Sequence, residues 1–522
     1  MTRSVQRWAG LGFAAGMGCV LFPWVGFGWS AWAGGLDGSL TQVWTPAFGM
    51  ALARSAGEAG MLAILGFLVG WPLGTFWGIR QPRFRPGMLL WALPLSVPSY
   101  FWALSVQSLR GWLPYAYQPW MDGFRGMLLA MLPLAVPLPW LAAWLKARRL
   151  GASALESTWI VGGPGAVRRA ALRSTRATSA AGALLVASLV FADSGCDQLM
   201  GCHGFSSEVM VAITARLNPA LASAKAAWGI VVVLPLAAGV AWVLSRELRP
   251  TELPRTLRGA SIGGAGFTPG ALIPMTVGML IVGIAVPLVG LVWPLLQIAT
   301  PMTCVVDAVR VGWERAWPSL QRPIAGVGVA LGLGTLLAMT AGVRRSESTL
   351  LGLAGLSLAV PSVIPALGWI GWIGGSPGLL DPLRQEGWLV GIATGSRLAP
   401  LTGVLLVLGW REISDSSRDA ARLARVPVRV FARRIFLPAL LPWILGAASW
   451  VSVLSLADTQ AESLLQPPGG GSFTAHIVAV MDNASAAAVA ALAGLHLVAV
   501  GLVSALAWGA WRLAGVGRKE AA

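Results

Sequence analysis

The chain has 522 residues, of which 56% are hydrophobic and only 11% are charged, and its mean hydropathy is +0.70. Soluble domains carry roughly 25% charged residues, so the composition excludes an ordinary water-soluble enzyme and predicts an all-α integral membrane protein. The net charge of +17 comes mainly from Lys and Arg in alternate connecting segments, which is typical of cytoplasmic loops. The basic excess therefore indicates topology and not nucleic-acid binding, and it predicts that both termini are cytoplasmic.

Twelve apolar stretches are long enough to cross a bilayer core, which needs about 17–25 residues per helix. In chain order they lie near 8–32, 59–79, 88–106, 126–145, 178–192, 226–244, 270–297, 324–341, 350–373, 388–410, 437–456 and 484–511. The first is longer than the roughly 7–15-residue apolar region of a signal peptide. We therefore expect a retained helix, with a cleaved signal as the alternative.

The sequence repeats itself at a nearly constant offset. Leu93–Ser99 is echoed 263 residues later by Leu356–Ser362, and Ala192-Asp193 is echoed by Ala457-Asp458. Six helices per copy is an even number, so the second copy enters the membrane in the same direction as the first, which makes a parallel repeat. The predicted organisation is therefore two six-helix halves, 1–245 and 270–522, joined by a basic cytoplasmic linker at 246–269.

Two long cytoplasmic loops, 146–177 and 411–434, follow the fourth helix of each half. Each contains a predicted capping box, Ser153–Glu156 in the first and Ser416–Asp419 in the second. Pro164 and Pro427 then interrupt the two helices. The pattern predicts a helix–break–helix segment that projects into the cytoplasm, although arginine-rich loops are also common as simple topology anchors.

The second loop resembles the EAA loop of bacterial ABC importer permeases, which reads EAA, three residues, Gly, nine residues, I-x-L-P. Here the loop reads Asp419-Ala420-Ala421, then Arg425 in place of the glycine, then Ile435-Phe436-Leu437-Pro438. The first loop is a weaker match, with Glu156-Ser157-Thr158 and Gly162. In that family the loop is a coupling helix that docks on a separate ATPase. The resemblance implies this role for Glu156, Gly162, Asp419, Ala420, Ala421, Arg425, Ile435, Leu437 and Pro438.

Other segments look like the fused, two-half permeases of the ferric-iron and thiamine group. These segments are the two Val-Pro-Ser motifs and Leu464–Gly469. The resemblance implies an inner (plasma) membrane permease of a bacterium, which is served by a periplasmic solute-binding protein and by two copies of an ABC ATPase subunit. Iron(III) is the first guess at cargo, followed by thiamine or another small solute.

No cofactor is expected in the chain itself. A P-loop needs Gly-Lys-Ser/Thr to hold phosphates, and none of the three lysines, Lys146, Lys225 and Lys519, follows a glycine. ATP and magnesium are therefore expected on the partner ATPase. The three histidines lie in different segments and have no metal-ligand spacing, so neither a metal site nor a catalytic site is predicted.

Candidate pathway residues are few. A proline within a span frees a backbone carbonyl that a neighbouring hydroxyl can bond, and a charged residue within a span is a functional candidate. These arguments select Pro98, Ser99, Pro361, Ser362 and Arg397, with packing as the alternative role. His496 is expected to be a packing residue and Glu58 a solvated acid at a helix entrance.

The acids that follow the fifth helix of each half are open to two interpretations. These acids are Asp193, Asp197, Asp458 and Glu462. They could receive a cationic cargo or a docking protein, or they could be solvated loop residues. Cys196 and Cys202 fall in the same predicted outer loop and form either a disulfide or two free thiols.

The rival function is an ion-gradient-driven secondary transporter of the major-facilitator type, which also has twelve helices in two parallel halves. In that group the long cytoplasmic loop lies between the halves. Here the two patterned loops lie within the halves, which favours the importer.

Overall fold

The computed structural model describes residues 3–34, 43–80, 94–95, 97–148, 150, 152–247, 269–344, 347–375, 377–411, 413, 419–421, 423–467, 470–481 and 483–520. Every regular element in these ranges is helical. Among the described residues, ten helices are long and apolar enough to cross a membrane, and the bent pair Glu347–Ala359 and Val363–Ile373 is an eleventh if it forms one span. The all-α membrane class is thereby confirmed. The predicted third span, near 88–106, falls partly outside the described residues.

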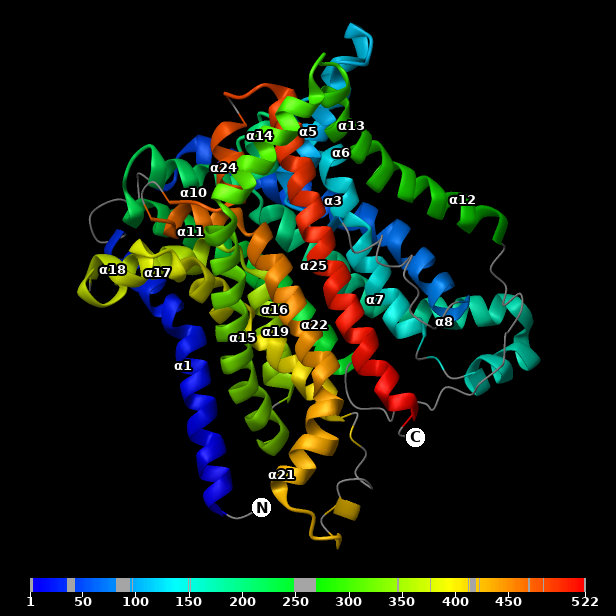
Figure 1. The fold of residues 1–522 in the computed structure, drawn as a ribbon. Coiled ribbons are helices and arrows are strands. Elements are labelled where there is room, and N and C mark those ends of the chain that lie inside the picture. Colours follow the sequence, from blue (N-terminus) through cyan, green and yellow to red (C-terminus); the bar gives the residue numbers. More distant parts are fainter. Residues whose placement is uncertain are drawn as a thin grey trace. The chain divides into compact units, whose positions relative to one another are not determined.

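The elements of the first half of the chain are α1 (Arg3–Gly34), α3 (Pro46–Arg80), α5 (Ser99–Arg110), η3 (Tyr115–Met121), α6 (Gly123–Ala135), α7 (Pro137–Ala147), α8 (Ala152–Ala192), α9 (Gly195–Leu199), α10 (Phe205–Thr214) and α11 (Pro219–Glu247). Those of the second half begin with α12 (Pro269–Leu280), η4 (Ile281–Ala285), α13 (Val286–Leu296), α14 (Pro301–Glu314), α15 (Ala316–Arg344), α16 (Glu347–Ala359), α17 (Val363–Gly375) and α18 (Pro377–Gln385). They continue with α19 (Trp388–Arg411), α21 (Val428–Phe431), η5 (Ala432–Phe436), α22 (Leu437–Ala457), α23 (Thr459–Leu465), α24 (Phe473–Val480) and α25 (Ala486–Glu520) (Figure 1).

The helices pack into two compact units. Unit 1 consists of residues 1–33, 302–358 and 362–522, and unit 2 consists of residues 34–301 and 359–361. The predicted halves, 1–245 and 270–522, describe the sequence repeat, and the packing units differ from them by an exchange of first helices. Most of the predicted linker, 248–268, lies outside the described residues.

Particular contacts hold the exchanged helices. In unit 1, the Trp372 indole N–H donates to the Phe22 carbonyl of α1 at 2.8 Å, and the two rings stack with centroids 4.5 Å apart. In unit 2, Ser105 Oγ of α5 donates to the Pro287 carbonyl of α13 at 2.7 Å. The first helix of each sequence half therefore belongs to the unit that is built mainly from the other half.

A glycine ridge sets the packing of α3 in unit 2. Gly66, Gly70, Gly74 and Gly78 recur every four residues along one face, the small-residue spacing that lets membrane helices approach closely. A Cβ at Gly74 would lie 2.2 Å from the Trp140 carbonyl oxygen of α7. The backbones of α3 and α7 are therefore in direct contact, and this contact fixes the position of the polar residues earlier on α3.

Unit 1 uses the same device between α15 and α19. A Cβ at Gly391 would lie 2.5 Å from the Arg322 carbonyl oxygen, and one at Gly395 would lie 2.5 Å from that of Gly326. Farther along, Ala330, Leu398 and Val451 form a buried apolar cluster between α15, α19 and α22. Figure 1 shows α21 and α24 at opposite ends of α22, so the predicted coupling loop and the polar region after α22 lie far apart.

Candidate functional site

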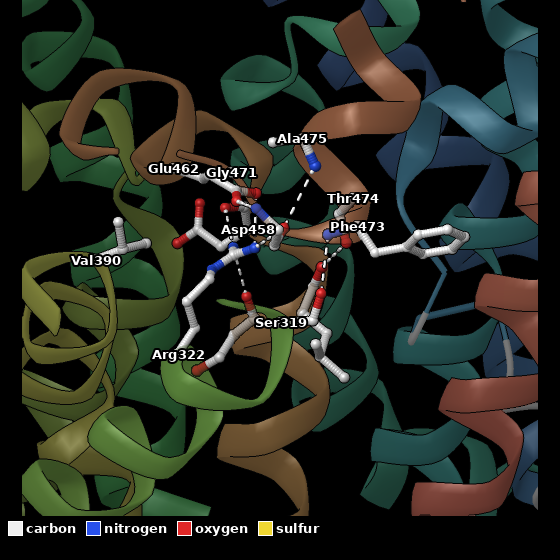
Figure 2. A network of polar contacts seen from close by, with 12 residues as sticks. Ser319, Arg322, Val390, Asp458, Glu462, Gly471, Phe473, Thr474 and Ala475 are labelled. Atoms are coloured by element: carbon white, nitrogen blue, oxygen red, sulfur yellow. Dashed lines mark hydrogen bonds and ion pairs between the residues drawn. The ribbon is translucent and has the colours of Figure 1, made fainter. Parts of the chain in front are cut away.

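A buried polar network lies where α15, α22, α23 and α24 meet in unit 1 (Figure 2). Arg322 Nη1 donates to Glu462 Oε2 at 2.6 Å and to Ser472 Oγ at 2.6 Å. Its Nη2 donates to the carbonyls of Ser455 at 2.8 Å and Asp458 at 3.1 Å. Arg322 is 3% exposed and Glu462 is 1% exposed. The buried positive charge is thus paired and bonded to four oxygens, which we call the Arg322 network.

The same network fixes the start of α24. The Ser472 N–H donates to Glu462 Oε1 at 2.9 Å, and Ser472 Oγ accepts from the Ala475 N–H at the N-terminus of α24. The Phe473 N–H donates to Ser319 Oγ of α15 at 2.8 Å. A helix leaves its first amide groups unsatisfied, so these bonds explain why α24 begins beside α15 (Figure 2).

Two of the predicted pathway residues lie next to this network. Arg397 Nε donates to the Ser357 carbonyl at 3.0 Å, and its Nη1 pairs with Asp458 Oδ2 at 3.3 Å. Ser362 Oγ donates to Gln460 Oε1 at 3.2 Å. Asp458 Oδ1 in turn accepts from the Ala461 N–H and caps α23. The structure therefore brings Arg397 and Ser362 together at the segment that follows α22.

The two Pro-Ser pairs occupy equivalent places in the chain. Pro361 and Ser362 lie in the break between α16 and α17, where the chain bends by 90°. Pro98 is buried and immediately precedes α5. Ser99 Oγ donates to Asp193 Oδ1 at 2.9 Å, just as Ser362 bonds the segment after α22. Each pair therefore ties a helix start to the residues that follow a later long helix, α8 for Ser99 and α22 for Ser362.

Three acids of unit 2 lie in a corresponding position, two of them buried and Asp193 half-buried. Glu58 and Asp197 are each 1% exposed, so the expectation of a solvated acid at a helix entrance is wrong for Glu58. The solvated-loop interpretation is also wrong for Asp197 and for Glu462, which packing covers. We call Glu58, Asp193 and Asp197 the carboxyl cluster.

The surroundings of the carboxyl cluster favour neutral acids. Burial raises the pKa of Asp197 to about 9, aided by the negative charges of Asp193 and Glu58 and opposed by Arg54. Burial also raises the pKa of Asp193, although Ser99 and three backbone N–H groups bond its carboxylate. Removing a charged group from water disfavours its charged form, so Asp193 and Asp197 hold protons more tightly than free carboxyl groups do.

The neighbouring cysteines are both buried free thiols. Burial, reinforced by the negative charges of Glu58 and Asp197, raises the pKa of Cys202 to about 12. Burial likewise raises the pKa of Cys196. A raised thiol pKa lowers the fraction of reactive thiolate, so both side chains are inert, small apolar groups in this structure.

The first predicted loop is a helix–break–helix segment. Gly163 interrupts α8 with φ 64° and ψ −169°, a conformation that is open essentially only to glycine. It immediately precedes Pro164, whose ring disfavours helical backbone at the residue before it. The helix begins at Ala152, one residue before the predicted cap at Ser153.

The second loop breaks in a similar way. Its described part contains helical residues at 419–421, and the Val426 N–H donates to the Ala421 carbonyl at 3.0 Å. Arg425 has φ 48°, so it adopts the left-handed conformation at the position where the EAA pattern has glycine. The predicted cap residues Ser416 and Ser417 lie outside the described residues.

Most predicted coupling residues face outward. Glu156, Gly162, Asp419, Ala420, Arg425, Leu437 and Pro438 are exposed, and Ala421 and Ile435 are half-buried. Two residues that were not singled out from the sequence are more prominent: Ile160 is 82% exposed and Leu423 is 86% exposed. They stand 263 residues apart, so each is the repeat counterpart of the other.

These features define a multi-pass helical membrane protein with two packed units, two buried polar sites and two exposed helix–break–helix loops. Within the part of the chain that the structure describes, no group of three or more His, Cys, Asp and Glu residues is arranged to hold a metal ion. Compared with protein-family models, with curated proteins and with solved structures, the chain gives no significant match.

Proposed function

We propose that the chain is the membrane-spanning subunit of an ATP-driven ABC importer, with both transmembrane halves fused in one polypeptide. The observation that carries the proposal is the pair of repeat-related loops, each broken by a residue with positive φ and each exposing a large apolar side chain, Ile160 or Leu423. Large apolar side chains exposed on a projecting segment favour contact with another protein.

The geometry of the loops suits a rigid docking element. A helix that ends at a fixed break keeps its exposed side chains at a defined angle to the following span, because the backbone there has few alternative conformations. Movement of an attached partner would be transmitted through the break to α8 in unit 2 and to α22 in unit 1. Two loops imply two docking sites, and hence two copies of the ATPase subunit.

The remaining parts of the proposal follow from the resemblance. A periplasmic binding protein delivers a small solute, with iron(III) as the first guess, and the two units alternate access to the two sides of the bacterial inner membrane. The partner ATPase holds ATP and magnesium, since the chain has no Gly-Lys-Ser/Thr sequence.

The test is co-purification of the tagged chain from its native membrane, with mass spectrometry of the proteins that co-elute. We expect a P-loop subunit near two copies per chain. Ile160→Asp and Leu423→Asp should each lower its recovery at least tenfold, since an interface anchor contributes about 2 kcal/mol or more. Leu217→Asp is the matched control, because Leu217 is 81% exposed in the connection between α10 and α11. An unchanged yield from the Ile160→Asp/Leu423→Asp double variant would refute the docking role.

One observation favours the alternative, an ion-gradient-driven secondary transporter. Buried acids within membrane helices mark ion and proton pathways, and Glu58 of α3 is 1% exposed. The two functions differ in energy source. Uptake by the purified chain in proteoliposomes that carry an imposed ion gradient and contain no ATPase would establish the alternative.

A further inference from the structure

In each unit, a serine of a long helix accepts a hydrogen bond from the first N–H of a short helix. The charged residue one turn after that serine is basic in unit 1 and acidic in unit 2. In unit 1 the Phe473 N–H at the start of α24 donates to Ser319 Oγ at 2.8 Å. In unit 2 the Phe205 N–H at the start of α10 donates to Ser55 Oγ at 2.9 Å. Ser55 and Ser319 are 264 residues apart, and one turn farther along each helix Glu58 stands where Arg322 stands in the other copy.

The acidic partner is present in both copies. Glu462 pairs with Arg322, and Asp197, 265 residues earlier, holds the equivalent place after α8. Asp193 likewise corresponds to Asp458, which pairs with Arg397. Neither Leu134 nor Pro133, which stand 263 and 264 residues before Arg397, carries a charge. Arg322 and Arg397 therefore have no cationic counterpart at the equivalent positions of unit 2.

Each acid of the carboxyl cluster has one oxygen without a hydrogen-bond donor in the described structure. Glu58 Oε1, Asp193 Oδ2 and Asp197 Oδ1 are buried and accept no hydrogen bond in the described structure. Asp197 Oδ2 lies against Gly204, where a Cβ would come within 1.9 Å of it, so the side chain is held inside the packing. Burying an unpaired carboxylate is far more costly than burying a neutral acid. Among the described residues, no buried cation takes the place of Arg322 in this site, and Arg54, which acts on Asp197, is exposed.

We propose that the carboxyl cluster of unit 2 is a proton-binding site, in which a proton from solution takes the place that the Arg322 guanidinium has in unit 1. A proton fits better than a metal ion, because no group of three His, Cys, Asp or Glu residues among the described residues has metal-binding geometry. The inference does not rest on the importer function, since it concerns only the charge balance within unit 2.

The groups that face Asp197 come from several elements. Glu58 and the exposed Arg54 lie on α3, and Asp193, Cys196 and Cys202 flank it in the connection that contains α9. Ser99 and Tyr100 of α5 pack against Gly195, and Gly126 of α6 packs against Met200. Among the described residues, Arg54 is the one cation that acts on the pKa of Asp197, and its effect is smaller than those of burial and the two acids.

The sign of the pH effect follows from these groups. Asp197 has an ordinary pKa of 3.8, which the fold raises to about 9, so between these values the folded site binds more protons than the opened one. The stability of the site is therefore complete below about pH 4 and is lost progressively as the pH rises toward about 9. One bound proton changes the opening equilibrium by up to about tenfold per pH unit.

The test is hydrogen–deuterium exchange of the full-length protein in detergent between about pH 5 and about pH 9, corrected for the intrinsic exchange rate. Peptides from α9 and α10, residues 195–214, report on the carboxyl cluster. Peptides from α23 and α24, residues 459–480, report on the Arg322 network and serve as the internal control. We expect protection of 195–214 to fall by up to about tenfold per pH unit, while protection of 459–480 stays nearly constant.

Three variants sharpen the result. Asp197→Asn removes one titrating group and should weaken the pH dependence of 195–214, whereas Glu58→Arg restores the missing cation and should abolish it. Asp122→Asn is the matched control, because it removes an acid of unit 2 whose side chain is 44% exposed and pairs with Arg110 at 3.0 Å, and it should leave the dependence in place.

Two results would overturn the inference. One is an equal pH dependence of both peptides in the unmodified protein. The other is protection of 195–214 that depends on the concentration of sodium or magnesium at fixed pH, because the neutralising charge would then be a metal ion.

Discussion

Replacing Arg322 by methionine should be one of the most destabilising single changes in unit 1. The guanidinium makes four hydrogen bonds of 2.6–3.1 Å, and its removal would leave the Glu462 carboxylate buried at 1% exposure without a counter-charge. Removing one partner of a buried ion pair costs about 3–5 kcal/mol. We expect a loss of this size in the free energy of unfolding.

The double variant Arg322→Met/Glu462→Leu separates the lost attraction from the stranded charge. Apolar groups of similar volume can replace a buried pair at little cost, so the double variant should be more stable than Arg322→Met alone by about 2 kcal/mol or more. The measurement is denaturant-induced unfolding in detergent micelles, followed by tryptophan fluorescence. The reasoning would be refuted if Arg322→Met stayed within about 0.5 kcal/mol of the unmodified protein, the range of an ordinary surface substitution.

Two further predictions concern packing and the shared serine bonds. Gly74→Leu should prevent close contact of α3 with α7, since even a Cβ would lie 2.2 Å from the Trp140 carbonyl oxygen. Overpacking of this kind costs about 1–3 kcal/mol or more. An unchanged melting temperature of the variant in detergent would contradict this prediction. Ser55→Ala and Ser319→Ala should each cost about 1–2 kcal/mol, because each leaves a phenylalanine N–H without its acceptor. Unequal losses from the two serine variants, measured by the same unfolding assay, would count against the structural equivalence of the two sites.

The sequence contains enough information to predict the helical membrane class and the position of most spans. Continuous apolar runs of sufficient length have few other stable structures in a bilayer, because the backbone must satisfy its own hydrogen bonds there. The breaks at Pro164 and Pro427 could also be predicted, since proline cannot continue a helix without losing a bond. These features depend on local chemistry alone.

The exchange of first helices could not be predicted in this way. Helices α1 and α12 are apolar on nearly every face, so their pattern does not indicate which neighbour each one contacts. The choice depends on complementary surfaces such as Gly26 against Gly368, where a Cβ at Gly26 would lie 2.4 Å from the Gly368 carbonyl oxygen. The glycines of α1 and α17 can be read in the sequence, but the sequence does not show that they pack against each other.

The Arg322 network and the carboxyl cluster were missed for a related reason. Arg322 lies at the edge of an apolar stretch, where an arginine that extends toward water is the ordinary interpretation, and Glu58 was expected to be solvated for the same reason. The repeat offset did contain the signal, because it aligns Glu58 with Arg322 and Asp197 with Glu462. An acid in one copy opposite a base in the other indicates a site where the two halves differ in charge.

The loop breaks give a final pair of opposite predictions. Gly163 has φ 64° and ψ −169°, and a Cβ there would meet no atom within 4 Å, so Gly163→Ala tests backbone strain without a steric clash. We expect it to destabilise the break by about 1–3 kcal/mol. Arg425 has φ 48°, a left-handed conformation that costs a residue with a Cβ about 1–2 kcal/mol. Arg425→Gly should therefore relieve strain there.

The net gain from Arg425→Gly is smaller than the relieved strain, because glycine also increases the entropy of the unfolded chain by about 0.4–1 kcal/mol. The measurement is hydrogen–deuterium exchange of residues 155–170 in Gly163→Ala and of residues 419–431 in Arg425→Gly. We expect protection to fall in the first and to hold or rise in the second. A loss of protection in both would mean that Arg425 is held by side-chain contacts that outweigh its backbone strain, and the two breaks would then be stabilised by different means.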